Sequence, residues 1–219
     1  MTALFRRQAL LALPFALFAA PLAGRAAVLA SGGFTPTPQD AADLARIAAY
    51  LNALHTLKAH FMQEAPDGGI SQGTAWIERP GRMRFQYDPP APYLLVAGHG
   101  LVVFHDAKLG QTSNIPIGQT PLGILLAPDI RFSGTVTVTG VKRLPGAITV
   151  SLVRTNAPGA GRLVLTFATA PLTLRQWSVF DAQDQETRVT LYDIETGGSF
   201  DPKLFTFIDP KFFQNRTGG

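Results

Sequence analysis

The chain has 219 residues, of which 19 are Lys or Arg and 15 are Asp or Glu, and it contains no cysteine. The missing thiols exclude a disulfide framework, thiolate metal sites, cysteine catalysis and lipid attachment to a cysteine of the chain itself. Because 46% of the residues are hydrophobic, the chain is able to form one domain with a sizeable core.

Residues 1–27 have the pattern of an export signal. Arg6 and Arg7 give a positive start, residues 9–20 are apolar, and residues 23–27 are small and suited to cleavage. The apolar stretch is short for a membrane span. The paired arginines leave both the general secretory route and the twin-arginine route open.

Removal of this segment changes the charge balance. It takes away three of the 19 basic residues and no acidic residue, so 16 basic and 15 acidic side chains remain. A net charge near +1 gives no reason to expect nucleic-acid binding.

A flexible leader is expected over residues 28–38, followed by one domain over residues 39–219. The domain should begin with a long helix that has Thr37 as N-cap and Pro38 in the first helical position. Asp40 and Asp43 suit the positive end of the helix dipole. The apolar stripe that predicts this helix consists of Leu44, Ile47, Leu51, Leu54, Leu57 and Phe61. Residues 66–69 should end the helix.

An antiparallel meander is expected from residue 70 onward. Its predicted strands are 70–77, 82–87, 93–97, 101–105, 111–117, 131–138, 147–153, 162–169, 172–179 and 187–194. Residues 120–128 predict a short helix that begins at Pro121, and residues 200–213 predict a turn and one more short strand. The expected class is α+β, with one sheet, one long helix and a short helical insert.

The segment 76–90 contains the strongest local pattern. Two strand-like pieces flank a Pro-Gly turn, and Arg79 stands immediately before that turn. The second piece places Met83, Phe85 and Tyr87 on one face and Arg82, Arg84 and Gln86 on the other. An apolar strand face beside one arginine indicates a binding surface rather than a catalytic centre.

Patterns for catalysis or metal binding do not occur in the sequence. His55 and His60 are five residues apart on the expected helix, which places them on different helix faces, unlike the i, i+4 pair of zinc helices. There is no G-x-S-x-G elbow and no Walker or Rossmann glycine pattern, so a hydrolase is disfavoured. We therefore expect no enzymatic activity, no metal and no cofactor.

Five segments in this order resemble the LolA family, the periplasmic carriers of outer-membrane lipoproteins. They are residues 57–63, 73–87, 120–126, 177–181 and 205–207. The resemblance implies a strongly curved antiparallel sheet, an incomplete barrel, with helices that cover its concave face as a lid. Acyl chains of a lipoprotein would enter the hydrophobic space between the sheet and the lid.

The resemblance also assigns residues to this space. Arg79 matches the arginine that donates hydrogen bonds to the lid backbone and holds the empty carrier closed. The candidate lipid-binding and lid residues are Arg79, Met83, Phe85 and Tyr87 on the sheet side, and Leu51, Leu54, Leu122 and Leu125 on the lid side.

The implied partners are an acylated lipoprotein as cargo, an ABC-type releasing complex in the inner membrane and an acceptor at the outer membrane. The protein itself is expected to be a periplasmic monomer. Two alternatives stay open, namely a carrier of the same fold for a phospholipid or glycolipid, and a LolA-like regulatory sensor module. Acyl chains are recognised by volume and apolarity, so no motif identifies the cargo.

Overall fold

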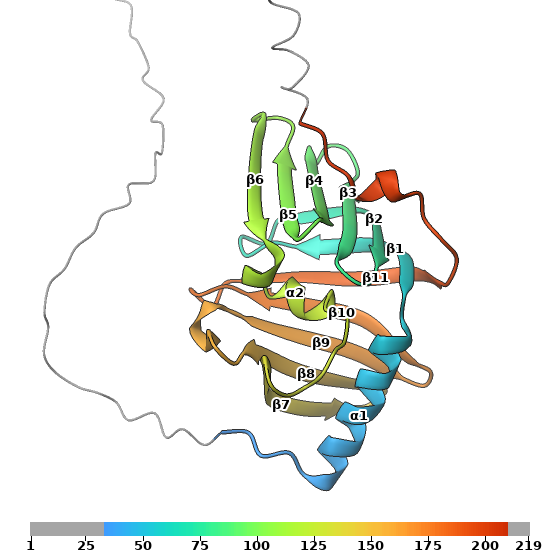
Figure 1. Cartoon of the computed structure of the whole chain (residues 1–219), viewed down its shortest axis with the longest axis vertical. Coiled ribbons are helices and arrows are strands. Elements are labelled where there is room, and N and C mark those ends of the chain that lie inside the picture. Colours follow the sequence, from blue (N-terminus) through green and yellow to red (C-terminus); the bar gives the residue numbers. More distant parts are fainter. Residues whose placement is uncertain (1–32, 210–219) are drawn as a thin grey trace, which may run out of the picture. The chain divides into compact units, whose positions relative to one another are not determined.

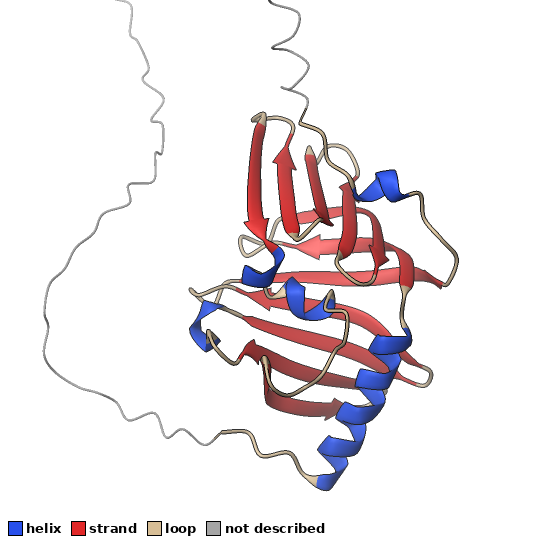
Figure 2. Cartoon of the chain, in the orientation of Figure 1, coloured by secondary structure: helices blue, strands red, loops and turns tan. Residues whose placement is uncertain are grey.

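The computed structural model describes residues 33–209; the predicted export signal and residues 28–32 of the predicted leader lie outside this range. The described residues form one open antiparallel sheet of 11 strands with one long helix and several short helical segments (Figures 1 and 2). The helices are α1 (Pro38–Ala53), α2 (Leu122–Leu125) and the 3-10 turns η1 (Ile117–Gln119), η2 (Pro158–Ala160) and η3 (Pro202–Phe205). The strands are β1 (Thr56–Glu64), β2 (Ile70–Glu78), β3 (Arg82–Tyr87), β4 (Tyr93–Gly98), β5 (Leu101–Asp106), β6 (Gln111–Pro116), β7 (Val136–Leu144), β8 (Ala147–Arg154), β9 (Arg162–Thr169), β10 (Leu172–Phe180) and β11 (Glu186–Thr196). The predicted fold class is confirmed.

The order of the strands explains the position of α2. The sheet runs β6-β5-β4-β3-β2-β1-β11-β10-β9-β8-β7, so β6 and β7 are its two edges although they follow each other in the chain. The connection between them, residues 117–135, must therefore cross from one edge of the sheet to the other. This connection contains η1 and α2. In Figure 1, α2 is drawn between strands β3–β6 and strands β7–β10.

Helix α1 begins where the sequence predicts. Thr37 and Asp40 form a capping box, in which the Thr37 side chain accepts from the Asp40 N–H and the Asp40 carboxylate accepts from the Thr37 N–H. Leu44, Ile47 and Leu51 form its buried stripe. Ring contact of Tyr50 with Phe167, at 6.0 Å between centroids, packs the helix on β9.

The prediction that this helix continues past Phe61 is wrong. The helix ends at Ala53, and residues 56–64 form β1, which pairs with β2 on one side and β11 on the other. Leu57, Ala59 and Phe61 are buried at a spacing of two. Since Leu57 and Phe61 lie four apart, they fit the helical and the strand period equally well, and two neighbouring strands decide the outcome. His55 and His60 therefore share no helix.

Two further boundaries differ from the predictions. Strand β7 starts at Val136 rather than near residue 131, because Gly134 adopts a positive φ of 75° that interrupts an extended chain. After β11, the turn predicted within residues 200–213 is present as η3 and no strand forms up to residue 209, while residues 210–213 lie outside the described range. Asp201 caps this turn by accepting from the Lys203 N–H, and the Arg84 guanidinium donates to the Leu204 carbonyl at 3.2 Å.

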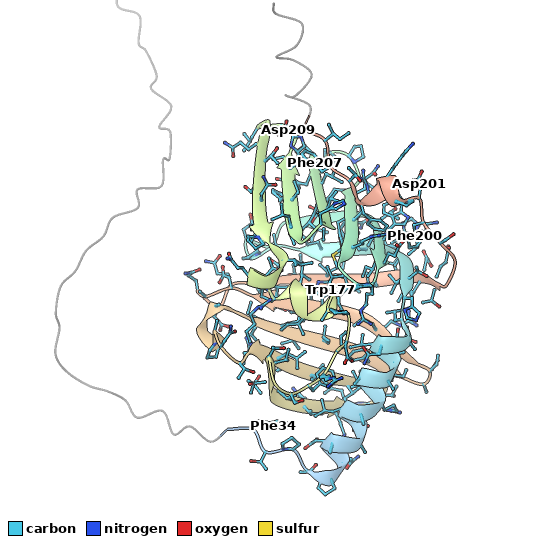
Figure 3. All side chains as sticks on the ribbon, in the orientation of Figure 1. Phe34, Trp177, Phe200, Asp201, Phe207 and Asp209 are labelled. Carbon is cyan, nitrogen blue, oxygen red and sulfur yellow. The ribbon has the colours of Figure 1, made fainter. Side chains whose placement is uncertain are left out.

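The two faces of the sheet differ in character. We call the face that carries Met83, Phe85 and Tyr87 the inner face; these side chains are buried in a single apolar cluster with residues of α1 and α2. The opposite, outer face of β3 carries Arg84 and faces the C-terminal segment. That segment continues past β5 and β6, where the Phe207 ring lies 5.1 Å from that of His105 and Thr112 donates to Asp209 at 2.9 Å (Figure 3).

Candidate functional site

Arg79 lies between β2 and β3 and is only 8% exposed. Its Nη1 donates to the Leu51 carbonyl in the last turn of α1, and its Nη2 donates to the Ala127 carbonyl just beyond α2 at 2.7 Å. A longer contact of 3.4 Å joins Nη2 to the Asn52 side-chain oxygen. One guanidinium therefore links the sheet to both helices of the inner face.

Both acceptors of Arg79 are backbone carbonyls near a helix end. The Leu51 carbonyl also accepts from the Leu54 N–H at 3.3 Å, and Ala127 lies two residues beyond α2. The last carbonyls of an α-helix have no intrahelical donor and carry partial negative charge. Helix α1 has no basic residue in its last turn, so the positive charge comes from the sheet. The Gly81 N–H adds a second bond from the same turn, to the Leu126 carbonyl at 2.9 Å. The β2–β3 turn is thus the point where the sheet holds both helices.

The electrostatics of Arg79 are those of a buried cation held by dipoles. Burial lowers the pKa of the guanidinium, and the charge of Asp129 acts in the opposite direction. Arginine nevertheless remains protonated in proteins. Within residues 33–209 the guanidinium forms no ion pair. Its Nε is buried without a hydrogen-bond partner, which opposes the closed arrangement.

Asn52 is a site residue that sequence reasoning missed. Its side-chain oxygen accepts from the Ile130 N–H at 2.9 Å, and its amide nitrogen donates to the Ile130 carbonyl at 3.1 Å. This pair of bonds fixes the chain after α2 to the end of α1. Ile130 lies 78 residues further along the chain, and a polar residue in a last helical turn carries no signal of so distant a partner.

The structure brings the predicted apolar site residues together. Six of them, Leu51, Leu54, Met83, Phe85, Tyr87 and Leu125, are buried members of the apolar cluster, and Leu122 is partly buried against it. The ring of Phe85 lies 4.7 Å from Phe61 and 5.8 Å from Trp177, measured between centroids. Trp177 is labelled near the centre of the described unit in Figure 3. Side chains of the protein itself thus fill the space between sheet and helices.

Tyr87 adds one polar group to this space. Its hydroxyl donates to the Gln63 side-chain oxygen at 2.8 Å, and its ring packs edge-on against Phe61. Burial raises the pKa of the Tyr87 phenol to about 12, with the Gln63 hydrogen bond acting against the shift. The group is therefore a neutral phenol at physiological pH.

A family model described as outer membrane lipoprotein carrier protein LolA matches residues 52–208. The chain belongs to this family. An outer-membrane lipoprotein carrier protein from Methylococcus capsulatus is 30% identical to it over 183 residues, which cover 80% of this chain and 85% of the relative. One from Pseudomonas aeruginosa is 28% identical over 197 residues, with 84% and 92% covered. A solved LolA superfamily protein from Nitrosomonas europaea aligns with a TM-score of 0.42 at 8% identity, covering 75% of this chain and 97% of that one.

Other features of this LolA family member bear on its chemistry. Residues 33–209 contain no group of three or more His, Asp or Glu side chains placed to hold a metal ion. A groove of about 780 Å³ opens beside α2, and its lining includes Leu126, Ala127, Phe205, Arg82, Arg154 and Lys203. In the described range, no helix combines the length and the apolar composition needed to cross a bilayer.

Proposed function

We propose that the protein is a periplasmic carrier that shields the acyl chains of lipoproteins and moves them from the inner to the outer membrane. The observation that carries this proposal is Arg79, a buried cation that joins the end of α1 and the chain after α2 to the sheet, with Leu51 of the apolar cluster as one of its acceptors. Membership of the LolA family supports the same function.

In this proposal α1 and α2 are the lid, and the apolar cluster is a collapsed binding space. The side chains that acyl chains would contact are Leu51, Leu54, Leu122, Leu125, Met83, Phe85 and Tyr87. Loading separates the lid from the sheet, breaks the Arg79 hydrogen bonds and replaces contacts within the protein by contacts with lipid.

The energy of acyl burial explains why a closed empty state is useful. Each buried methylene contributes about 0.8 kcal/mol, so three chains of about 16 carbons would gain on the order of 35 kcal/mol in a preformed cavity. Non-covalent binding does not exceed roughly 20 kcal/mol, and a carrier bound that tightly would not release its cargo. A collapsed space offsets much of this gain, since its own packing and the Arg79 hydrogen bonds are lost on loading.

Transport between the two membranes requires a partner protein at each membrane. An ABC-type complex in the inner membrane would deliver the lipoprotein at the expense of ATP, and a tighter-binding acceptor at the outer membrane would receive it. The carrier acts as a monomer, breaks no covalent bond and needs no cofactor. The direction of lipoprotein transport comes from ATP hydrolysis by the inner-membrane complex and from the higher affinity of the outer-membrane acceptor for the lipoprotein.

A release assay tests the proposal. Inner-membrane vesicles that contain radiolabelled lipoprotein are incubated with ATP and the purified mature protein, and the soluble fraction is examined for a one-to-one complex. The same reaction without ATP is the control. A soluble complex that depends on ATP and on the protein is expected. No complex, together with another co-purified amphiphile such as a phospholipid, would instead make the protein a carrier for that amphiphile.

A further inference from the structure

Arg79 shares one unusual property with a second arginine. Among the buried side-chain nitrogen and oxygen atoms of residues 33–209, only the Nε atoms of Arg79 and Arg154 have no hydrogen-bond partner. Neither guanidinium takes part in an ion pair within the same range. Buried polar groups are nearly always satisfied, so two arginines with the same defect suggest a common role.

Arg154 contacts the opposite end of the short helix. It is the last residue of β8, and its Nη2 donates to the Thr120 carbonyl at 2.9 Å, two residues before α2 begins. Thr120 in turn organises the first turn, since its carbonyl accepts from the Gly123 N–H at 3.1 Å. Arg79 donates to the Ala127 carbonyl on the other side of the helix. The two arginines thus hold α2 at both of its ends.

Gly123 permits this close approach. A Cβ atom at position 123 would lie 2.3 Å from the Ile117 carbonyl oxygen and 3.0 Å from the Arg154 Nη2. The first distance is shorter than real Cβ contacts, so any larger residue would force α2 away from η1 and crowd the guanidinium. The absence of a side chain in the middle of α2 lets the helix lie against Arg154.

A helix of four residues needs such external support. Isolated helices shorter than about 12 residues are marginal in water, so the contacts of α2 with the rest of the protein determine its position. Those contacts come from two different parts of the sheet, because Arg79 follows β2 and Arg154 ends β8. We call the hydrogen bonds Arg79–Ala127 and Arg154–Thr120 the two tethers of α2. A movement that separates these two parts of the sheet would break one or both of them.

We propose that Arg154 is a second positioning residue of the lid. It holds the N-terminal end of α2, while Arg79 holds the C-terminal end. The inference rests on the proposed carrier function for its role in cargo loading, but not for its structural content. Both bonds run from a guanidinium to a backbone carbonyl, and both leave an Nε unsatisfied. The desolvation cost of each unsatisfied Nε offsets part of what the two hydrogen bonds contribute to the closed position of α2, which suits a lid that must open.

Hydrogen exchange of the native protein tests the tether without any cargo. In Arg154→Ala, exchange in residues 117–126 should become about 10-fold faster or more, the loss expected for a hydrogen bond to a charged group. Exchange in α1 and in the central strands should stay as in the wild type. Arg154→Lys should restore part of the protection, because an ammonium group is also a donor for the Thr120 carbonyl.

The matched control is Arg162→Ala. Arg162 lies on the neighbouring strand β9, pairs with Asp184 at 3.0 Å and stacks over the Phe180 ring, so its loss should leave residues 117–126 protected. Unchanged exchange in Arg154→Ala would overturn the inference. An equal rise in exchange over the whole sheet would also overturn it, since Arg154 would then contribute only to global stability.

A cargo arm separates this inference from the proposed function. Binding of a synthetic tripalmitoylated cysteinyl peptide is measured for the wild type and for Arg154→Ala, and the variant should bind several-fold more tightly because its lid opens more easily. If no variant binds the lipopeptide but exchange rises as expected, the carrier function fails and the tether stands. If the wild type binds and Arg154→Ala matches it in binding and in exchange, the tether fails and the carrier stands.

Discussion

The carboxylate of Asp40 lies 2.8 Å from the guanidinium of Arg143, which attaches the first turn of α1 to the edge strand β7. The same guanidinium lies 2.7 Å from Asp43. The other end of α1 is held differently, by Arg79 and a backbone carbonyl. Ion pairs between charged side chains thus fix the start of the helix, whereas hydrogen bonds of Arg79 to a backbone carbonyl and of Asn52 to Ile130 hold its end.

The attachment of the first turn should depend on pH. The Thr37 N–H and hydroxyl, and after them Arg143, stabilise the carboxylate and lower the pKa of Asp40 below the ordinary value of 3.8. A lowered pKa in the folded state contributes stability that is complete above the ordinary value and is lost as the pH falls through the lowered one. Urea unfolding between pH 6 and pH 2.5 should therefore show a loss of stability that Asp40→Asn shows less strongly.

The control for this titration is Asp88→Asn, which changes an exposed carboxylate in the connection after β3. Its unfolding profile should follow that of the wild type over the whole pH range. If Asp40→Asn also follows the wild type throughout, the network of Thr37, Asp40 and Arg143 contributes nothing to acid sensitivity.

Local patterns predicted most of the sheet. Strand β3 has the predicted bounds, 82–87, because Met83, Phe85 and Tyr87 alternate with polar residues and a Pro-Gly turn precedes them. Strand β9 likewise has the predicted bounds, 162–169. The failure at residues 56–64 has the opposite cause, since an apolar spacing of four is common to both periods and only the pairing with β2 and β11 selects a strand.

The site was less predictable than the sheet. The sequence places Arg79 beside a turn, but its acceptors lie 28 and 48 residues away along the chain. The family resemblance alone supplied the expectation that it contacts the lid backbone. Arg154 carried no signal, since an arginine at a strand end usually lies at the surface. Contacts of this kind depend on where a connection crosses the sheet, which local periodicity does not encode.

Replacement of Arg79 should impair release rather than loading. Arg79→Leu removes the buried cation together with its bonds to Leu51 and Ala127, so the closed empty state loses about 1.5–3 kcal/mol relative to the loaded state. Cargo should then be retained roughly 10- to 100-fold more tightly. The measurement is the rate of lipoprotein transfer from the purified complex to outer-membrane vesicles.

Arg82→Leu is the matched control for that experiment. Arg82 stands on the other side of the same turn, is exposed and pairs with Glu78 at 2.5 Å. It should load and release lipoprotein as the wild type does. Transfer by Arg79→Leu at the rate of the control would contradict the role of Arg79 as the element that closes the carrier.

Two glycines near α2 offer a comparison of the same substitution in different surroundings. Gly123→Ala places a Cβ atom 2.3 Å from the Ile117 carbonyl oxygen, whereas a Cβ at Gly118 meets nothing within 4 Å. The first variant should lose about 1–3 kcal/mol of stability through overpacking, and its displaced lid should bind a hydrophobic dye more strongly. Gly118→Ala should be neutral or slightly more stable. Equal dye binding by the two variants would show that α2 tolerates the displacement.

The two faces of β3 provide the sharpest test of the binding space. Phe85→Glu removes ring contacts with Phe61 and Trp177 and places a carboxylate inside the apolar cluster. Loss of the ring alone should lower the free energy of unfolding by about 3 kcal/mol or more, and desolvation of the carboxylate adds to this loss. Gln86→Glu introduces the same charge one residue further on, at an exposed position of the outer face, and should change stability by less than about 0.5 kcal/mol.

Lipid binding distinguishes a binding space from an ordinary core. At urea concentrations where both variants remain folded, Gln86→Glu should bind the tripalmitoylated peptide like the wild type. Phe85→Glu should bind it at least about 10-fold more weakly, because a carboxylate in the lining has no polar partner among acyl chains. Wild-type affinity in folded Phe85→Glu would mean that acyl chains do not reach the inner face of β3, and the proposed space between sheet and lid would have to lie elsewhere.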